Sequence, residues 1–137
     1  MQLLPDELRA QIPPLYTQEP LKAGGQIVRA KYFIPNENKA WFVIEAGEID
    51  GELTFFGYYA NSPNSEWKFF TLKELQSIKI NNLTVERDLD FKPVKFGDAL
   101  NQFQENLERR NHFFRFYYKK FVRFLKKYKI SFLSTIY

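Results

Sequence analysis

A long amphipathic segment near the C-terminal end constrains the fold of this chain more than any other feature. Apolar residues there recur every seven positions, with further ones at companion positions: Leu100, Phe103, Leu107, Phe114, Tyr117, Phe121, Phe124 and Tyr128. At 100° per residue these side chains form one broad stripe of a helix. Most of the basic residues fall on the opposite side: Arg109, Arg115, Lys119, Lys120, Arg123, Lys126 and Lys127. With Asp98 as its N-cap, the pattern predicts a helix from Ala99 to Tyr128, roughly 45 Å long.

The same segment separates charge along the chain. The last thirty residues hold nine of the twenty Lys and Arg residues and one acidic residue, a balance of +8, whereas the preceding 107 residues carry −4. They also hold ten of the twenty-five aromatic residues. Two residues depart from the pattern, since Arg110 lies in the apolar stripe and Phe116 among the cations. A mildly acidic body followed by a basic, aromatic helix indicates an acidic partner.

The first 97 residues predict an α+β body. Pro5 and Asp6 suit the start of a short helix, and Thr71 with Glu74 forms a capping box for a second one. Strands are expected where apolar residues alternate or cluster between turn residues: 27–33, 40–45, 53–60, 66–70 and 85–91. Gly57 is expected at a bulge or a close backbone approach. The predicted fold is a mainly antiparallel sheet of four to five strands with short helices. Residues 98–137 form the basic helical extension, which we expect to pack on this body within a single domain.

Composition excludes several functional classes. The chain has no Cys, so disulfides, thiolate catalysis and Cys-type zinc sites are ruled out. No apolar run approaches the ~18 residues that would cross a bilayer, and the N-terminus lacks the pattern of a secretory signal. The expectation is a cytoplasmic protein without stable membrane insertion.

The body resembles DUF2958, a bacterial family of unknown function, over about residues 1–97. The residues that carry the resemblance are Leu3-Leu4-Pro5, Ile12 to Tyr16, Ala30 to Phe33 with Pro35, Trp41, Phe55 to Gly57, Phe70 to Leu75, Val85 to Asp88, and Phe91 to Pro93. The resemblance implies a small protein carried on plasmids and other mobile elements, and the family has no established activity that could be transferred to this chain. Residues 61–67 depart from the acidic, Gly-containing stretch of the family, and the basic helix lies outside the family pattern.

An enzymatic alternative depends on three carboxylates. Glu86, Asp88 and Asp90 alternate along the expected strand 85–91 and could share one face. Clustered carboxylates can hold Mg²⁺ for phosphodiester chemistry, which would make the chain a metal-dependent nuclease. A solvated strand face, or ion pairs with Arg87 and Lys92, is the simpler interpretation. His112, the only imidazole, has no nucleophile signature nearby, and Glu45, Glu48, Asp50 and Glu52 are interpreted as a solvated loop.

The preferred hypothesis is a non-enzymatic binding protein that requires no metal or cofactor. Its basic helix would engage a nucleic acid or nucleoprotein, and the mobile-element setting suggests an inhibitor of a host defence complex, of the anti-CRISPR type, acting on an RNA-guided nuclease. The expected binding residues are Arg109, Arg110, Arg115, Phe116, Lys119, Lys120, Arg123, Lys126, Lys127 and Lys129. Basic amphipathic helices also bind anionic membrane surfaces and partner grooves, and the heptad spacing allows a homodimer.

Overall fold

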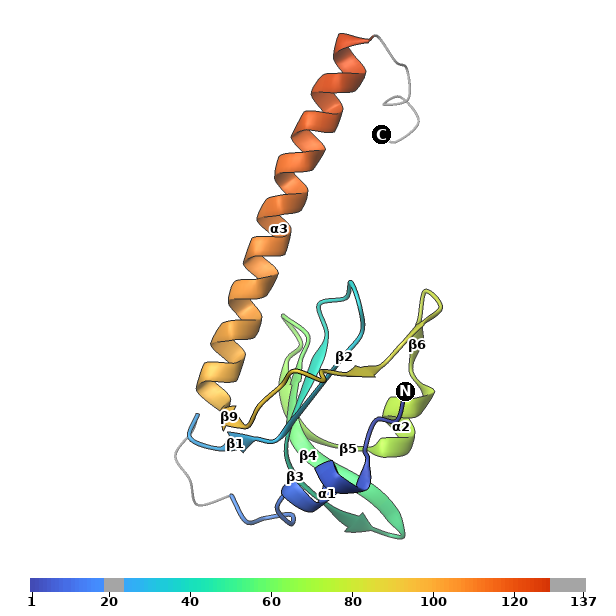
Figure 1. The fold of residues 1–137 in the computed structure, drawn as a ribbon, viewed down its shortest axis with the longest axis vertical. Coiled ribbons are helices and arrows are strands. Elements are labelled where there is room, and N and C mark those ends of the chain that lie inside the picture. Colours follow the sequence, from blue (N-terminus) through green and yellow to red (C-terminus); the bar gives the residue numbers. More distant parts are fainter. Residues whose placement is uncertain (19–23, 129–137) are drawn as a thin grey trace. The chain divides into compact units, whose positions relative to one another are not determined.

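The computed structural model describes residues 1–18 and 24–128. The chain divides into two compact units, Met1–Leu100 and Asn101–Tyr137, which are described separately below. In chain order the elements are α1 (Asp6–Gln11), β1 (Ile27–Val28), β2 (Ala30–Phe33), β3 (Ala40–Ile49), β4 (Glu52–Ala60), β5 (Glu66–Thr71), α2 (Leu72–Ser77), β6 (Lys79–Ile80), β7 (Leu83–Thr84), β8 (Glu86–Arg87), β9 (Val94–Lys95) and α3 (Phe96–Lys127) (Figure 1).

A five-stranded antiparallel sheet forms the centre of the first unit. Its strand order is β5-β4-β3-β2-β8, so the three longest strands are neighbours that follow one another in the sequence. Two short ladders, β1-β9 and β6-β7, accompany it. This confirms the predicted α+β fold with a mainly antiparallel sheet.

The central hairpin β3–β4 has two irregular features. Its register shifts between Val43 and Glu45, which leaves Ile44 as the extra residue of a β-bulge. Gly57 pairs with Val43 next to this bulge, and a Cβ at Gly57 would overlap the carbonyl oxygen of Phe42. The predicted close approach at Gly57 is therefore confirmed, and the bulge lies on the facing strand.

The hydrophobic core lies on one face of the sheet. Tyr32, Val43, Phe55 and Phe70 contribute fully or almost fully buried side chains from four adjacent strands, and Leu75 of α2 packs against them. The Tyr32 hydroxyl donates a 2.7 Å hydrogen bond to the Leu3 carbonyl, which ties the N-terminal segment to the sheet. Burial raises the pKa of this hydroxyl, while Arg87 acts in the opposite direction.

The helix signals of the body act as the sequence predicts. Pro5 is the N-cap of α1, and Thr71 caps α2. The Thr71 hydroxyl accepts a 3.0 Å hydrogen bond from the Glu74 backbone N–H, and the Glu74 carboxylate accepts one of 3.3 Å from the Thr71 N–H. Both halves of the capping box are present, which confirms this local prediction.

Several predicted strands have different bounds. The expected strand 27–33 is divided into β1 and β2 at Arg29, and the expected strand 85–91 is reduced to β8. Val94 and Lys95 form a strand that the sequence interpretation missed, because they pair with Val28 and Ile27 far away in the chain. Two tight hairpin turns were also missed, at Asp50-Gly51 and Asn81-Asn82, where all four residues have positive φ.

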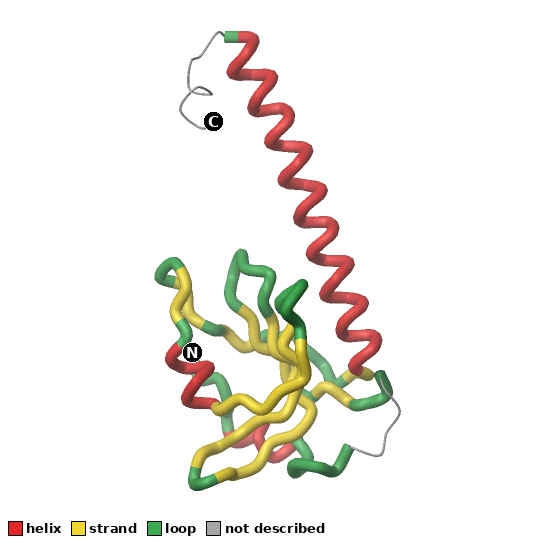
Figure 2. Tube along the Cα trace, turned by 180° about the vertical axis from the view of Figure 1, so that it is seen from behind, coloured by secondary structure: helices red, strands yellow, loops and turns green. Residues whose placement is uncertain are grey.

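The C-terminal helix is confirmed as one continuous element (Figure 2). It begins at Phe96, three residues earlier than expected, so Asp98 lies inside the first turn and is not the N-cap. An acidic side chain still suits that position because of the helix dipole. Among the described residues, no helix is both long and apolar enough to cross a membrane. The expected packing of this helix on residues 1–97 stays a prediction.

Candidate nucleic-acid interface and aromatic pocket

The basic residues of α3 form a continuous face along the second half of the helix. Arg115, Lys119, Arg123 and Lys126 succeed one another at spacings of three or four residues, which places them in one row on the helix surface. From Arg115 to Lys127 the helix rises roughly 18 Å. Arg109, Lys120 and Lys127 flank the row, and all seven cations are exposed. We call these seven residues the basic face.

The basic face is not neutralised by neighbouring carboxylates. The ion pairs recorded within the described residues are Lys31–Asp88, Lys39–Glu37 and Lys68–Glu66, and none includes a cation of the basic face. The acidic residues of α3 are confined to its first half, with Glu108 the last of them. The charges of the basic face are therefore exposed to solvent and free to meet an anionic ligand.

Phe116, the aromatic residue among these cations, has a local contact. The Lys120 ammonium nitrogen lies 4.5 Å from the centroid of its ring, which is within cation–π range. The ring is nevertheless 50% exposed. Phe116 can therefore offer a flat apolar surface within the basic face while Lys120 holds it in place.

The remaining residues of the predicted interface differ from this pattern. Arg110 is only partly exposed and does have an interaction partner, in keeping with its position in the apolar stripe. Lys129 lies outside the described residues. The structure thus brings together seven of the predicted cations and Phe116 on one side of a single helix.

The apolar side of the same helix carries large exposed rings. Tyr117, Tyr118, Phe121 and Phe124 are each exposed to about half of their surface, from 46% to 54%. Several of them interact with other residues, and Phe124 lies 4.8 Å from Tyr128 between ring centroids. Considered by itself, the helix has one aromatic side and one cationic side.

The carboxylates of the nuclease alternative do not form a shared strand face. Strand β8 ends at Arg87, so Asp88 and Asp90 lie beyond it. One Asp88 oxygen pairs with Lys31 at 3.8 Å, and the other accepts a 3.0 Å hydrogen bond from the Asp90 backbone N–H. Within residues 1–18 and 24–128, no group of three or more His, Asp or Glu side chains is placed to hold a metal ion. Asp88 does form an ion pair, but its partner is Lys31 and not the expected Arg87 or Lys92.

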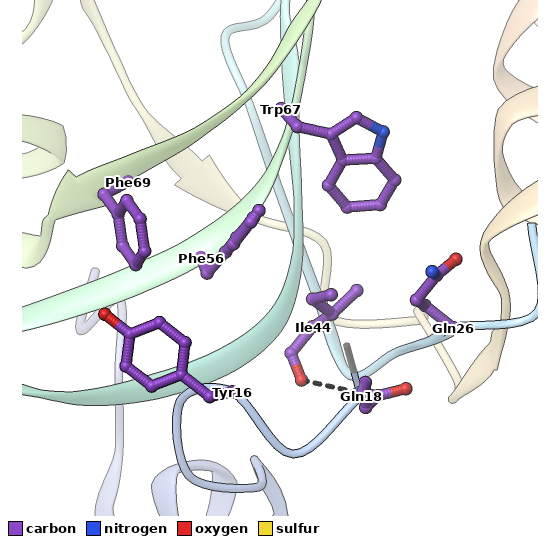
Figure 3. A pocket seen from close by; sticks show the side chains of 7 residues that line it. All are labelled: Tyr16, Gln18, Gln26, Ile44, Phe56, Trp67 and Phe69. Atoms are coloured by element: carbon purple, nitrogen blue, oxygen red, sulfur yellow. Dashed lines mark hydrogen bonds between the residues drawn. The ribbon is translucent and has the colours of Figure 1, made fainter. Parts of the chain in front are cut away.

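The first unit also contains a pocket that sequence reasoning missed. Its volume is about 410 Å³, and its lining is mostly aromatic: Tyr16, Gln18, Gln26, Ile44, Phe56, Trp67 and Phe69. Tyr16 and Phe69 lie toward one side and Gln18 and Gln26 toward the other, with Phe56 and Ile44 between them (Figure 3). Phe56, Trp67 and Phe69 come from paired positions of β4 and β5, on the sheet face opposite the core.

A buried carboxylate fixes the segment that forms one wall of the pocket. Glu45 is only 4% exposed, and it accepts hydrogen bonds from the backbone N–H groups of Tyr16 at 3.0 Å and Gln18 at 2.6 Å and from the Thr17 hydroxyl at 3.3 Å. These bonds hold Tyr16 in a backbone conformation with φ of 71°, which is uncommon for a residue with a large side chain. The interpretation of Glu45 as part of a solvated loop was wrong, because it lies inside β3 directly after the bulge.

The two glutamines of the pocket have different roles. The Gln18 amide donates to the carbonyls of Ile44 at 2.9 Å and Ile27 at 3.2 Å and accepts from the Ile27 N–H at 2.6 Å, so it joins β1 to β3. The Gln26 side-chain oxygen accepts from the Gly24 N–H at 3.1 Å. Its NH₂ group has no partner among the described residues. Gln18 therefore builds the wall, while the Gln26 NH₂ group forms no hydrogen bond within the described chain.

Comparison of the chain with protein families, curated proteins and solved structures finds no match. The resemblance to DUF2958 therefore stays a prediction from the quoted motifs, and the function is argued from the two surfaces above.

Proposed function

We propose that the protein is a non-enzymatic binding protein whose basic face contacts the phosphates of a nucleic acid or nucleoprotein. The observation that carries this proposal is the row of exposed cations on α3 that form no ion pair among the described residues. Cations already paired within the protein would have to lose those partners before they could bind phosphate. The cations of the basic face form no ion pair within the described residues, so they can bind phosphate without losing one.

The binding energy would come mainly from release of counterions and from charge-assisted hydrogen bonds. Each Lys or Arg that replaces a condensed cation at a phosphate contributes a salt-dependent gain in affinity. Arg115 and Arg123 can each grip a phosphate with two parallel N–H groups, whereas the Lys residues act as point charges. Phe116 can stack on an unpaired base beside them, since aromatic faces accept any base.

The concrete form of the proposal is an inhibitor of a cytoplasmic host defence complex, acting on an RNA-guided nuclease. Such a nuclease holds its guide and target strands in charged channels that are recognised by shape and backbone charge. An inhibitor of this kind needs complementary shape and charge and no catalytic group. Support comes from the exposed basic face and from the mobile-element setting that the resemblance implies.

The test is a binding titration with a matched control. We expect labelled single-stranded RNA or DNA to bind the wild-type chain, and the triple variant Arg115→Glu, Lys119→Glu, Arg123→Glu to lose that binding. The control reverses three exposed lysines of the first unit, Lys73, Lys79 and Lys92. Both variants change the net charge equally, from +4 to −2. Equal loss in the two variants would mean that total charge, and not the basic face, determines binding.

A second candidate function is binding to an anionic membrane surface. The exposed rings on the other side of α3 favour it, because interfacial helices combine aromatic and basic faces. Flotation with vesicles that contain or lack anionic lipid separates the two functions. Flotation that requires anionic lipid and disappears in Phe121→Ser, Phe124→Ser would support the membrane function, since these changes leave the basic face intact.

A further inference from the structure

We propose that the aromatic pocket of the first unit is a binding site for a nucleobase, which it would recognise by stacking and by hydrogen bonds to the base edge. This inference adds a second contact to the proposed function, but it depends on the seven residues that line the pocket and not on the basic face. The pocket, at about 410 Å³, has the size of ordinary small-ligand sites.

The aromatic rings of the pocket are inclined to one another and line a concave surface. Phe56 and Phe69 lie 4.8 Å apart between centroids at 50°, and Phe56 and Trp67 lie 5.7 Å apart at 72°. The Tyr16 ring extends this surface, with its centroid 6.3 Å from that of Phe69. Large parts of three rings remain exposed: 64% of Tyr16, 45% of Phe69 and 38% of Trp67. Rings with exposed faces that are inclined to each other can enclose a flat ligand between them.

Trp67 is held in position by residues outside the pocket. Its ring lies 4.6 Å from Phe96 and 5.4 Å from Tyr58 between centroids, and neither of these residues lines the pocket. The indole is therefore supported by rings outside the pocket, while 38% of its residue stays exposed. A stacking surface fixed in this way loses little conformational freedom when a ligand binds.

The polar groups of the pocket select a neutral ligand that can form hydrogen bonds. Among the described residues the lining contains no charged side chain, so the site does not recognise a phosphate or another ion. The Trp67 indole N–H, the Gln26 NH₂ group and the Tyr16 hydroxyl have no hydrogen-bond partner within the described chain. Two of these groups are donors, and the third can donate or accept. A flat ring with acceptors on its edge fits this set, and nucleobases have both properties.

Three local irregularities of the backbone lie at this pocket. The bulge at Ile44 places its side chain in the lining, Tyr16 has positive φ, and the buried Glu45 fixes the segment that carries Tyr16. The core face of the sheet requires none of these features, since Tyr32, Phe55 and Phe70 pack there with regular pairing. Bulges and strained residues that the surrounding structure holds in place are concentrated at binding sites.

The experiment uses uncharged nucleosides, because they carry no phosphate for the basic face. Adenosine, guanosine, cytidine and uridine are titrated into the full chain while tryptophan fluorescence and backbone amide NMR shifts are recorded. We expect at least one nucleoside to cause saturable changes centred on Trp67 and Gln26. Phe69→Ala should weaken binding roughly five- to 150-fold, the range found when a base-stacking ring is removed, while Gln26→Ala should weaken it and change the preference among bases. The control Leu89→Ala removes an apolar side chain that is 66% exposed outside the pocket, and it should have no effect.

Two results would overturn the inference. One is the absence of saturable binding for all four nucleosides by a wild-type chain whose NMR spectrum shows it folded. The other is benzyl alcohol binding as tightly as the best nucleoside with no effect of Gln26→Ala, which would make the pocket a non-selective apolar site. Neither result bears on the proposal for the basic face. That proposal would fail if the chain bound no polynucleotide, or if reversing the charges of Arg115, Lys119 and Arg123 left polynucleotide binding unchanged.

Discussion

The buried carboxylate of Glu45 gives a sharp test of how the pocket is built. Replacing Glu45 by Gln keeps the shape of the side chain but exchanges one acceptor oxygen for an NH₂ group. In the wild type, one carboxylate oxygen of Glu45 lies 2.6 Å from the Gln18 backbone nitrogen and 3.3 Å from the Thr17 hydroxyl oxygen. In the orientation of Gln that preserves the bond to Tyr16, the new NH₂ group takes the place of this oxygen and faces both groups. The Gln18 N–H then has no acceptor, although its residue is only 7% exposed.

The expected cost follows from these contacts. Hydrogen bonds to a charged group contribute about 1.5–3 kcal/mol each, and a buried donor left without a partner costs about 1–3 kcal/mol. Because the second bond of this carboxylate oxygen, at 3.3 Å, is long, we assign most of the loss to Gln18. We therefore expect Glu45→Gln to lower the free energy of unfolding by about 2–3 kcal/mol. Glu45→Ala should cost more, since the Tyr16 N–H also loses its acceptor.

Urea denaturation followed by circular dichroism measures this cost, with Glu48→Gln as the control. Glu48 lies on the same strand three residues further on and is exposed, so its change should stay within about 0.5 kcal/mol. Glu45→Gln should also weaken nucleoside binding, because the segment that carries Tyr16 would lose its second anchor, the bond from the Gln18 N–H. A Glu45→Gln variant as stable as Glu48→Gln would refute the role assigned to this carboxylate.

Three further predictions concern the helix and the sheet. If about four cations of the basic face contact phosphates of a single strand, the logarithm of the association constant should fall with log[salt] at a slope of about −3. A slope near zero in a salt titration would show that phosphates are not the contact. Gly57→Ala should destabilise the fold by about 1–3 kcal/mol or more in thermal unfolding, because a Cβ there meets the Phe42 carbonyl and one of the two paired strands must shift. A stability equal to wild type would mean that β3 and β4 can separate at Gly57 without cost. Thr71→Ala should cost about 1 kcal/mol by removing the cap of α2, whereas Thr71→Ser should retain most of it; equal losses would exclude the hydroxyl as the cap.

Local signals predicted much of this fold. The seven-residue spacing gave α3 almost to its observed end, and Thr71 with Glu74 marked the start of α2. Within the expected strand 27–33, the alternate residues Val28, Ala30 and Tyr32 are all buried. These features depend on neighbours within a few residues, so one sequence contains the information that they need.

Some local signals were present but were not used. Asp50-Gly51 is a typical pair for a two-residue hairpin turn, and the structure has both residues at positive φ, 53° and 79°. Recognising it would have extended β3 to Ile49 and removed the solvated loop assigned to Glu45. Asn81-Asn82 form a similar turn between β6 and β7, with φ of 51° and 65°.

The pocket could not have been predicted from local patterns. Its rings meet because the register of β4 and β5 pairs Phe56 with Phe69, and because a bulge two strands from the sheet edge directs Ile44 toward them. Tyr16 joins them through a carboxylate that lies 29 residues away in the chain. Each of these is a long-range relation that alternation and spacing leave undetermined.

The central claim, that one side of α3 meets a polyanion, can be measured directly by site-specific cross-linking. The chain contains no Cys, so a single Cys can carry a benzophenone label at a chosen position. Phe116 and Tyr118 form a matched pair, because both are uncharged, are exposed to 50% and 46%, and lie about 160° apart around the helix axis. With labelled single-stranded RNA, the account predicts strong cross-linking from Phe116→Cys and little from Tyr118→Cys. Equal yields at the two positions, or a higher yield at Tyr118, would contradict it.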